Sequence, residues 1–475
     1  MMYDRMRLVL RRTLVVMMVF YVSGCIEARS SKGAEPIIES LTCSKNDVKI
    51  RINSRFKEAY LKADFFATYD HDINLEEMPY EIVTMPFICN VIALIWISGK
   101  RYSIPSMDEE LYHSFKTVKK IFRLSYPQTS WKGKLVPEKL VKFSDTFPKV
   151  EKSKERRALL FSGGLDSTSS LLYHNKEKLL LITAWGQYDN PLKEVGAWEE
   201  RKRRVERVAS LYGHTNTFIK SNYAEFFNWR VVNSLSREIE NWRVSAVDGI
   251  GWSGLVAPIF FAKKCSALYI ASSNSWYHTY IDCINPYVDS SMLFANYRLI
   301  HDQFDFTRLD KAVYIHRTCE KKGLHKPYVK VCQRSRLWGD SNCCDCKKCL
   351  LTILEFCSAG ADHRDYGFPV SLSTAVKRSL DLLRGSVEYE TMWHYMDIQL
   401  TMKKMLDTYD SSVVRAITPF LKMNLVKTKI SDKRLAIKSK IDWNDFTKLI
   451  PSVKVPSTLR DDKWEVERKA SAALK

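Results

Sequence analysis

The sequence predicts an α/β protein built on a doubly wound parallel sheet. Between residues 158 and 360, short apolar runs alternate with stretches of helical periodicity. A glycine turn separates the first apolar run from the first helix of this region. Such alternation is typical of βαβ units, in which consecutive strands pair in parallel. With 475 residues and 45% hydrophobic side chains, the chain has ample material for a large core.

Within this region, strands and helices follow one another at short intervals. Apolar runs predict buried strands at 158–161, 179–184, 217–219 and 267–271. Helical spacing predicts helices through Leu171, over 198–212 and over 253–264, the second of them ending at Gly213.

Two further regions flank this core. An α+β amino-terminal domain is expected over 43–127, where 48–52 alternates like a half-exposed strand, 86–97 is an apolar helix or buried strand and 108–124 has helical spacing. A basic, proline-containing linker is expected over 128–157. The last region, 361–475, is expected to be mostly helical.

The net charge of +20 lies largely outside the core. Residues 111–157 hold 13 Lys or Arg against 4 Asp or Glu, and residues 411–460 hold 11 against 3. This balance excludes an acidic, solvating protein. The two stretches could track an RNA backbone, but a solvated basic surface is the more frequent outcome and no recognised RNA-binding module accompanies them.

The turn after the first predicted strand has the composition of an anion site, with the residues Ser162, Gly163, Gly164, Leu165, Asp166, Ser167 and Thr168. Adjacent glycines let the backbone approach a phosphate, and the N-terminus of the following helix adds N–H groups and positive potential. The sequence has neither the Gly-Lys-Ser/Thr ending of a Walker A loop nor a G-x-G-x-x-G dinucleotide motif. A plain glycine turn with helix-capping side chains is the alternative.

The string S-G-G-L-D-S, placed between a strand and a helix, resembles the PP-loop of the ATP-pyrophosphatase superfamily. The resemblance implies an adenine nucleotide alpha-hydrolase-like fold that binds ATP and Mg²⁺ and cleaves ATP between the α- and β-phosphates. AMP would pass to a substrate oxygen, with release of pyrophosphate. It also implies that Ser162, Gly163, Gly164 and Ser167 hold the pyrophosphate portion, and that Asp166 orders the loop or a magnesium ion.

Four cysteines, Cys332, Cys343, Cys346 and Cys349, are spaced C-x10-C-x2-C-x2-C. Four thiolates can enclose a tetrahedral Zn²⁺, and because no coordination position stays open the ion would be structural. An iron–sulfur cluster and a redox dithiol are the alternatives. The neighbouring Cys344 and Cys357 are expected to be spectators.

The residues around these cysteines extend the resemblance. Val331-Cys332 and the segment from Asn342 to Thr352 resemble the R-V-C … N-C-G-x-C-x-K-C-L-R-T ending of QueC-like (7-cyano-7-deazaguanine synthase-like) proteins of queuosine biosynthesis. Cys344 stands where glycine is usual, and Leu351 where arginine is usual. On this resemblance, 158–360 is a PP-loop ATPase domain with a four-cysteine metal site, and 45–127 is more faintly similar to longer relatives.

Three polar residues follow predicted strands. Asn274 follows the strand at 267–271, and Gln187 and Asp189 follow the strand at 179–184. Doubly wound sheets bind ligands at the carboxyl ends of their strands, so Asn274 is a candidate substrate contact and the other two are candidate nucleotide contacts. Each of the three is equally well explained as a turn former.

Two further segments, 285–289 and 307–311, also resemble parts of the QueC-like group. Asp289 lies in the first and is a candidate substrate contact, while Arg308 and Lys311 lie in the second. A basic side chain here could neutralise a carboxylate substrate or the α-phosphate. Ordinary ion pairs are the alternative.

Residues 1–30 form an apolar leader. A ten-residue apolar run from Thr13 to Val22 follows four arginines and is too short for a bilayer, which takes about 20 residues. The pattern resembles a secretory signal, and Val22-Ser23-Gly24-Cys25 resembles a lipoprotein processing site; a mis-started extension and a weak surface anchor are the alternatives. Use of ATP and reduced thiols favours the cytoplasm, and no stable membrane span is expected elsewhere.

Together these features predict an ATP-dependent C–N ligase that adenylates a carboxylate or amide oxygen of a small-molecule acid. Ammonia or an amine donor would then displace AMP and give an amide or nitrile, with catalysis by positioning and charge stabilisation. The expected catalytic residues are Asp166, Arg308 and Lys311. Two alternatives stay open: an enzyme that modifies tRNA or protein, and a nucleotide-sensing module of a multi-gene system such as a defence system.

Overall fold

The computed structural model describes residues 33–143, 156–239, 241–277, 283–334, 339–431, 443–456 and 461–472. The apolar leader predicted over 1–30, including Val22–Cys25, lies outside these ranges.

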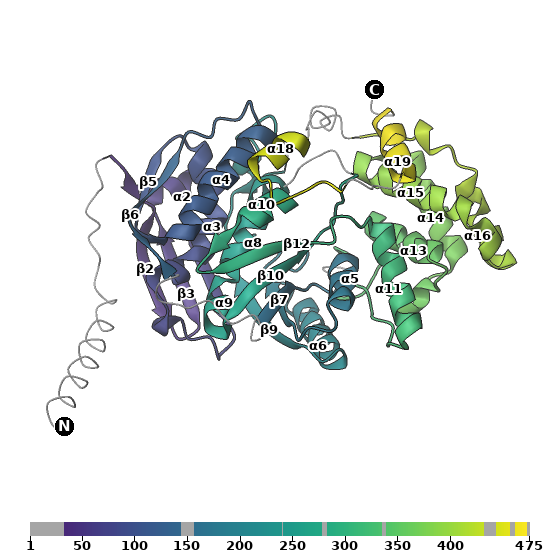
Figure 1. The fold of residues 1–475 in the computed structure, drawn as a ribbon, viewed down its shortest axis with the longest axis horizontal. Helices are drawn as coiled ribbons and strands as arrows, with labels where there is room; N and C mark the ends of the chain where they lie inside the picture. Colours follow the sequence, from purple (N-terminus) through teal and green to yellow (C-terminus); the bar gives the residue numbers. More distant parts are fainter. Residues whose placement is uncertain are drawn as a thin grey trace.

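A nine-stranded sheet forms the centre of the protein (Figure 1), and five consecutive strands of it are parallel. Across the sheet they are β9 (Thr215–Ser221), β8 (Leu180–Trp185), β7 (Arg156–Leu160), β10 (Cys265–Ala271) and β12 (Tyr297–Asp302). The earliest of the five in the chain, β7, is central, and the strand order reverses between β7 and β10. The predicted parallel core is therefore confirmed, with a topological switch point between these two strands.

The sheet as a whole is mixed, whereas the sequence predicts a parallel one. β2 (Ile38–Ser44), β3 (Asp47–Ile52) and β4 (Phe65–Tyr69) form an antiparallel meander that joins the core where β4 pairs with β9. β11 (Leu293–Phe294) pairs antiparallel with β12 at the other edge. The predicted strand at 48–52 is confirmed as β3, whose residues alternate between buried and exposed. An alternating pattern defines a strand but not its pairing partner, so the extended sheet could not be anticipated.

A second, smaller parallel sheet contains β1 (Glu35–Pro36), β5 (Arg101–Asp108) and β6 (Lys134–Val141). β6 lies within 128–157, for which the sequence predicts a linker. Leu135 is the one fully buried residue of β6. An edge strand with so little buried surface leaves no apolar period in the sequence.

Helices cover both faces of the nine-stranded sheet. One face packs against α3 (Tyr80–Ile97), α4 (Glu109–Ser125), α8 (Asp248–Leu255), α9 (Ala257–Lys263) and α10 (Pro286–Ser291). The other face packs against α5 (Leu165–Tyr173) and α6 (Val195–Leu211). The helices predicted at 108–124 and 198–212 are α4 and α6, and the one predicted at 253–264 is divided between α8 and α9. Short connecting helices are α2 (Ser54–Tyr60), α7 (Trp229–Val232), the 3₁₀ turn η1 (Leu75–Glu77) and the π-helical turn η4 (Arg243–Val247).

The described part of the carboxyl-terminal region, 361–475, is mostly helical, as predicted, and two helices that precede it in the chain pack with it. Beside the sheet (Figure 1) lie α11 (Arg308–Lys322), α13 (Lys347–Ser358), α14 (Leu372–Arg384), α15 (Tyr389–Lys404), α16 (Ser411–Leu421) and α19 (Asp461–Ala472). A short parallel pair, β13 (Ser386–Val387) and β14 (Lys429–Ile430), and the 3₁₀ turns η5 (His363–Tyr366), η6 (Leu406–Thr408) and η7 (Leu425–Lys427) connect them. α18 (Trp443–Leu449) instead returns to the sheet side and packs on α4.

Two described helical stretches, Tyr80–Ile97 and Arg243–Lys263, are long and apolar enough to cross a membrane. In each, however, 83% of the apolar window is buried inside the protein. The first stretch is α3, which packs against α8 of the second. The segment predicted at 86–97 as a buried core element is therefore a core helix.

The close approach of α3 and α8 depends on glycine. A Cβ on Gly254 would lie 2.5 Å from the Met85 carbonyl oxygen, which belongs to the rigid backbone of α3. We expect Gly254→Ala to lower the free energy of unfolding by about 1–3 kcal/mol, the usual cost of overpacking, as measured by urea denaturation. Gly196→Ala is the matched control, because a Cβ there meets nothing within 4 Å on the exposed side of α6. Equal losses in the two variants would contradict the prediction.

Candidate functional site

A cavity of about 1050 Å³ lies at the carboxyl ends of β7 and β10. Its wall includes Ser162, Asp166 and Ser167 of the glycine turn, and Ser273 and Asn274 after β10. Open α/β sheets bind ligands at this position, outside the strand ends where the order reverses. Asn274 therefore faces the cavity predicted for it, as does Gln187 after β8.

The turn from β7 into α5 is shaped by Gly163. Its φ of +72° lies in the left-handed region that favours glycine. A Cβ on Gly163 would lie 1.7 Å from Nη1 of Arg204, so a side chain has no room. The Ser162 and Ser167 hydroxyl oxygens are 3.3 Å apart, and both residues line the cavity with Gly164. Of the other predicted nucleotide contacts, Leu165 and Thr168 are buried and do not line the cavity.

Asp166, which also lines the cavity, is held by two cations from the first turn of α11. Arg308 Nη1 lies 2.8 Å from Oδ2 of Asp166, and Lys311 Nζ lies 3.4 Å from Oδ1. A capping box at Thr307 fixes this first turn. Burial raises the pKa of Asp166, but the charges of Arg308 and Lys311 outweigh it and the net shift is downward. Asp166 is therefore ionised at neutral pH.

Arg308 and Lys311, predicted to be catalytic, lie behind Asp166 and not on the cavity wall. Arg308 Nε also lies 3.4 Å from Glu355 Oε1, and Lys311 Nζ donates to the Ser272 carbonyl. The ion-pair alternative thus describes both side chains. Their place in the structure is that of positioning residues, which orient the carboxylate that does face the cavity.

The structure does not bring Asp289 to the cavity, in contrast to the predicted substrate contact. Asp289 is fully buried in α10, and His301 Nδ1 lies 2.7 Å from its Oδ2. α10 packs on β12, so the carboxylate faces the interior of the protein. Burial raises the pKa of Asp289 even though His301 partly offsets it.

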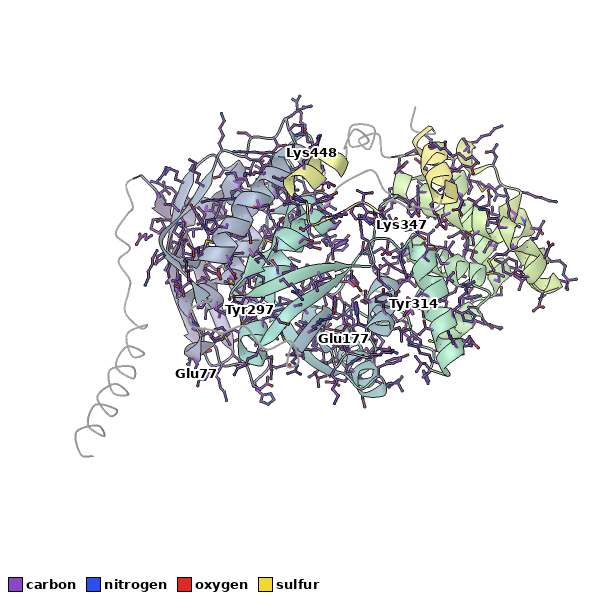
Figure 2. All side chains as sticks on the ribbon, in the orientation of Figure 1. Glu77, Glu177, Tyr297, Tyr314, Lys347 and Lys448 are labelled. Carbon is purple, nitrogen blue, oxygen red and sulfur yellow. The ribbon has the colours of Figure 1, made fainter. Side chains whose placement is uncertain are left out.

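Two lysines at the cavity were not among the sequence candidates. Lys347 and Lys348 open α13, and both line the cavity. Lys347 lies between the sheet and the carboxyl-terminal helices (Figure 2) and pairs with Glu388. Within the described ranges, the Lys348 ammonium has no hydrogen-bond or ion-pair partner, and burial together with the charge of Arg308 lowers its pKa. One feature of the sequence could have identified these lysines: they lie between two predicted metal ligands, at the start of a helix.

Two arginines of α6 support the glycine turn from outside the cavity. Arg201, only 2% exposed, lies 3.0 Å from an Asp189 oxygen and 3.5 Å from an Asp340 oxygen. Arg204 pairs with Asp340 at 2.5 Å and donates to the Ser162 carbonyl at 3.2 Å. Asp189, considered as a nucleotide contact, is therefore an ion-pair partner. Arg201 lies on the apolar face of α6. A charged residue at such a position is unusual, and this feature of the sequence could have marked Arg201 as a buried ion-pair partner.

A second wall of the cavity is formed by η4 and α8. It carries Arg243, Ser245, Asp248 and Trp252, none of which the sequence pattern indicated. Arg243 Nη1 lies 2.8 Å from Asp248 Oδ2. Burial raises the pKa of Asp248 to about 6, with Arg243 offsetting only part of the effect. Carboxylates with raised pKa values concentrate at functional sites, which makes this wall a candidate substrate surface.

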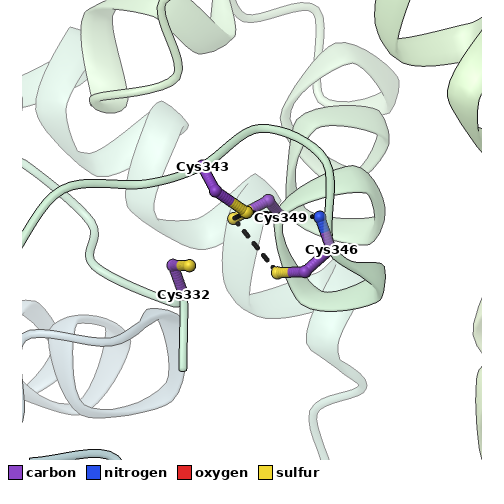
Figure 3. Close-up of side chains that lie close together, drawn as sticks. All are labelled: Cys332, Cys343, Cys346 and Cys349. Carbon is purple, nitrogen blue, oxygen red and sulfur yellow. Dashed lines mark hydrogen bonds between the residues drawn. The ribbon is translucent and has the colours of Figure 1, made fainter. Parts of the chain in front are cut away.

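The four predicted metal ligands meet at one point (Figure 3). The sulfur atoms of Cys332, Cys343, Cys346 and Cys349 all lie within 4.8 Å of one another. Two of these S···S distances are 3.5 Å and 3.9 Å. A tetrahedral site with Zn–S bonds of about 2.3 Å has S···S edges of about 3.8 Å, so the cluster could bind one metal ion such as zinc. In a [4Fe–4S] cluster each thiolate binds a different iron atom, and in a [2Fe–2S] cluster the four thiolates are divided between two irons, so the close approach of all four sulfurs favours a single ion.

Cys344 lies beside the four sulfurs but outside the cluster. Its φ of +52° is in the left-handed region, and its thiol points to the Asn342 carbonyl oxygen, 3.7 Å away. This conformation favours glycine, so a cysteine is an uncommon residue at this position. Cys357 is buried in α13, away from the cluster.

Removal of one ligand should abolish metal binding at this site. We expect purified wild-type protein to contain about one zinc per chain and Cys343→Ser to contain almost none, because three thiolates cannot close the tetrahedron. Cys344→Ser is the matched control and should retain the metal. Elemental analysis of the two variants decides; loss of metal from both, or iron in place of zinc, would contradict the assignment.

The buried Asp248 predicts a pH-dependent cost in stability. Its pKa is raised from 3.8 to about 6, so its contribution favours folding below pH 3.8 and is lost as the pH rises through about 6. Asp248→Asn should therefore raise the free energy of unfolding by about 2 kcal/mol near pH 8 and change it little near pH 4. Urea denaturation at both pH values measures this. Asp407→Asn, at an exposed position away from the cavity, should show no such difference. A less stable Asp248→Asn near pH 8 would refute the prediction.

No protein-family model, curated protein or solved structure matches this chain. The basis for a functional assignment is therefore the set of side chains around the cavity, the glycine turn and the cysteine cluster.

Proposed function

We propose that this chain is an ATP-dependent adenylating enzyme of the PP-loop class, QueC-like, with an adenine nucleotide alpha-hydrolase-like core. The observation that carries the proposal is the S-G-G-L-D-S turn at the switch point of the sheet, with Ser162, Gly164 and Ser167 on the cavity wall. Backbone N–H groups, hydroxyl groups and the N-terminus of α5 converge there, which suits a polyphosphate.

The phosphates of ATP would meet the glycine turn on one side and Lys348 on the other. Lys348 lines the cavity and has no partner among the described residues, so its ammonium is free to neutralise the leaving pyrophosphate. Both oxygens of Asp166 face cations, which favours its loop-ordering role over direct ligation of magnesium. Magnesium would then enter bound to ATP, as is usual for this ion.

The acceptor would bind at the wall formed by η4 and α8. A cavity of about 1050 Å³ is at the upper end of the usual range of about 300–1,000 Å³ for ligand sites, so it suits a nucleotide and a small acid together. Arg243, Asp248 and Asn274 supply polar groups for the acid. Ammonia or an amine would displace AMP to form an amide or nitrile, and a deazaguanine acid is one candidate acceptor.

The cysteine cluster would hold a structural zinc ion in this enzyme. Four thiolates leave no coordination position for substrate, so the metal takes no part in the chemistry. None of the eleven cysteines in the described part of the chain is placed in a disulfide, which is compatible with a cytoplasmic location.

Pyrophosphate release tests the proposal. With ATP, magnesium, ammonia and a panel of small acids, the wild-type chain should form AMP and pyrophosphate. Ser162→Ala and Asp166→Asn should lower the rate by about 10²–10³-fold, the usual effect of removing one preorganised charge-stabilising group. Ser210→Ala, an exposed serine on α6, is the control and should leave the rate unchanged.

Other outcomes would select the alternatives. Tight nucleotide binding with no pyrophosphate release under any condition would replace the enzyme with a nucleotide-sensing module. Turnover that requires tRNA, with binding that weakens steeply with salt, would place the acceptor on RNA and give the basic flanks a role.

A further inference from the structure

The glycine turn and the cysteine cluster are joined by two short connections, each beginning at a different metal ligand. We propose that a metal ion at the four cysteines holds the glycine turn in its anion-binding conformation, so that metal and nucleotide bind cooperatively, with Arg204 and Asp340 as positioning residues. This inference rests on the proposed function, in which the turn binds the phosphates of ATP.

The first connection runs from Cys332 back to Lys330. The Lys330 N–H donates to the Gly163 carbonyl at 2.8 Å, and the Lys330 carbonyl oxygen lies 3.5 Å from the position of a Cβ on Gly164. Lys330 Nζ in turn donates to the Cys332 carbonyl at 2.6 Å. A shift of Cys332 therefore displaces backbone that touches both glycines of the turn.

The second connection runs from Cys343 back to Asp340 and across to α6. Asp340 binds the Arg204 guanidinium through both of its oxygens, at 2.5 Å and 3.1 Å. Arg204 donates to the Ser162 carbonyl and occupies the space that a side chain on Gly163 would fill. The Asp340 N–H is fixed by Glu200 of the same helix at 2.8 Å. Arg204 thus contacts both the cysteine segment, through Asp340, and the glycine turn, through Ser162, so a shift of one would displace the other.

Asn342 joins the two connections near the metal. Its Oδ1 accepts from the N–H groups of Val331 and Cys332, at 3.1 Å and 3.2 Å. A metal ion bound by Cys332 and Cys343 would lock the same two segments together far more firmly than these hydrogen bonds. Without the ion, the segments that support the turn can separate. Linkage then requires that nucleotide raise the affinity for metal by the same factor as metal raises the affinity for nucleotide.

The test measures both affinities on the full chain with α,β-methylene ATP, which cannot be cleaved between the α- and β-phosphates. We expect the zinc-loaded protein to bind this analogue about tenfold more tightly than protein stripped by a chelator. The analogue should raise zinc affinity by an equal factor. Arg204→Ala should keep one zinc per chain yet lower the coupling factor, because only the connection through Lys330 remains. Arg203→Ala, at an exposed neighbour on α6, should leave the coupling factor unchanged.

A second readout does not depend on nucleotide. Removal of the metal should accelerate amide hydrogen exchange over 163–168 in the wild-type chain, while exchange in the central strand β8 stays slow. Equal analogue affinity with and without zinc, or full coupling in Arg204→Ala, would overturn the inference even if pyrophosphate is released. If metal and nucleotide binding are coupled but no pyrophosphate is released, the proposed enzymatic function is wrong. The coupling between the two sites would still hold in that case.

Discussion

The backbone at Gly163 imposes the constraint on which the rest of the site depends. It needs a left-handed conformation and an absent side chain, because Arg204 occupies the space where a Cβ would be. These two requirements let β7 turn directly into α5 and bring Ser162, Gly164 and Ser167 to one wall of the cavity. A glycine turn of this kind needs support from its surroundings, because glycine has no side chain to pack and loses more conformational entropy on folding than other residues. Its support comes from α6, from the 330–332 segment and from the segment that carries the cysteines.

Buried charge networks provide much of that support. Asp166 is held between Arg308 and Lys311, and Asp340 is held between Arg201 and Arg204. Buried ion pairs of this type add little net stability, because the cost of removing charges from water offsets their attraction. These networks instead fix the relative positions of elements. Arg308 links Asp166 of α5 to Glu355 of α13, and Arg204 links α6 to Asp340 of the cysteine segment. Asp248 is a similar case, because Arg243 offsets only part of the free-energy cost of burying its carboxylate at the cavity wall.

The cavity is shared between parts of the chain that the sequence separates. Lys347 and Lys348 come from the cysteine segment, Glu388 and Ser431 from the carboxyl-terminal region, and Trp252 from the helix that packs on α3. Residues beyond the region 158–360, among them Glu388 and Ser431, therefore contribute to the cavity wall. The carboxyl-terminal region adds acidic groups and a serine to the cavity wall. The amino-terminal region supplies α3, on which α8 of the other wall packs.

Features that depend on neighbouring residues in the chain could be predicted from the amino-acid sequence. The glycine turn, the cysteine spacing, the alternation of β3 and the apolar runs of the parallel core depend on residues close together in the chain, so their patterns could be recognised. Other features depend on contacts between distant segments, and no local pattern encodes them. They are the pairing of β4 with β9, the position of β6 in a second sheet and the burial of Asp289. The same reason explains the side chains that sequence reasoning missed. In the sequence, Arg204, Lys348 and Asp248 are charged residues with no distinguishing pattern. The tertiary structure places them beside a glycine turn, a cysteine cluster and a cavity wall, where burial and neighbouring charges set them apart.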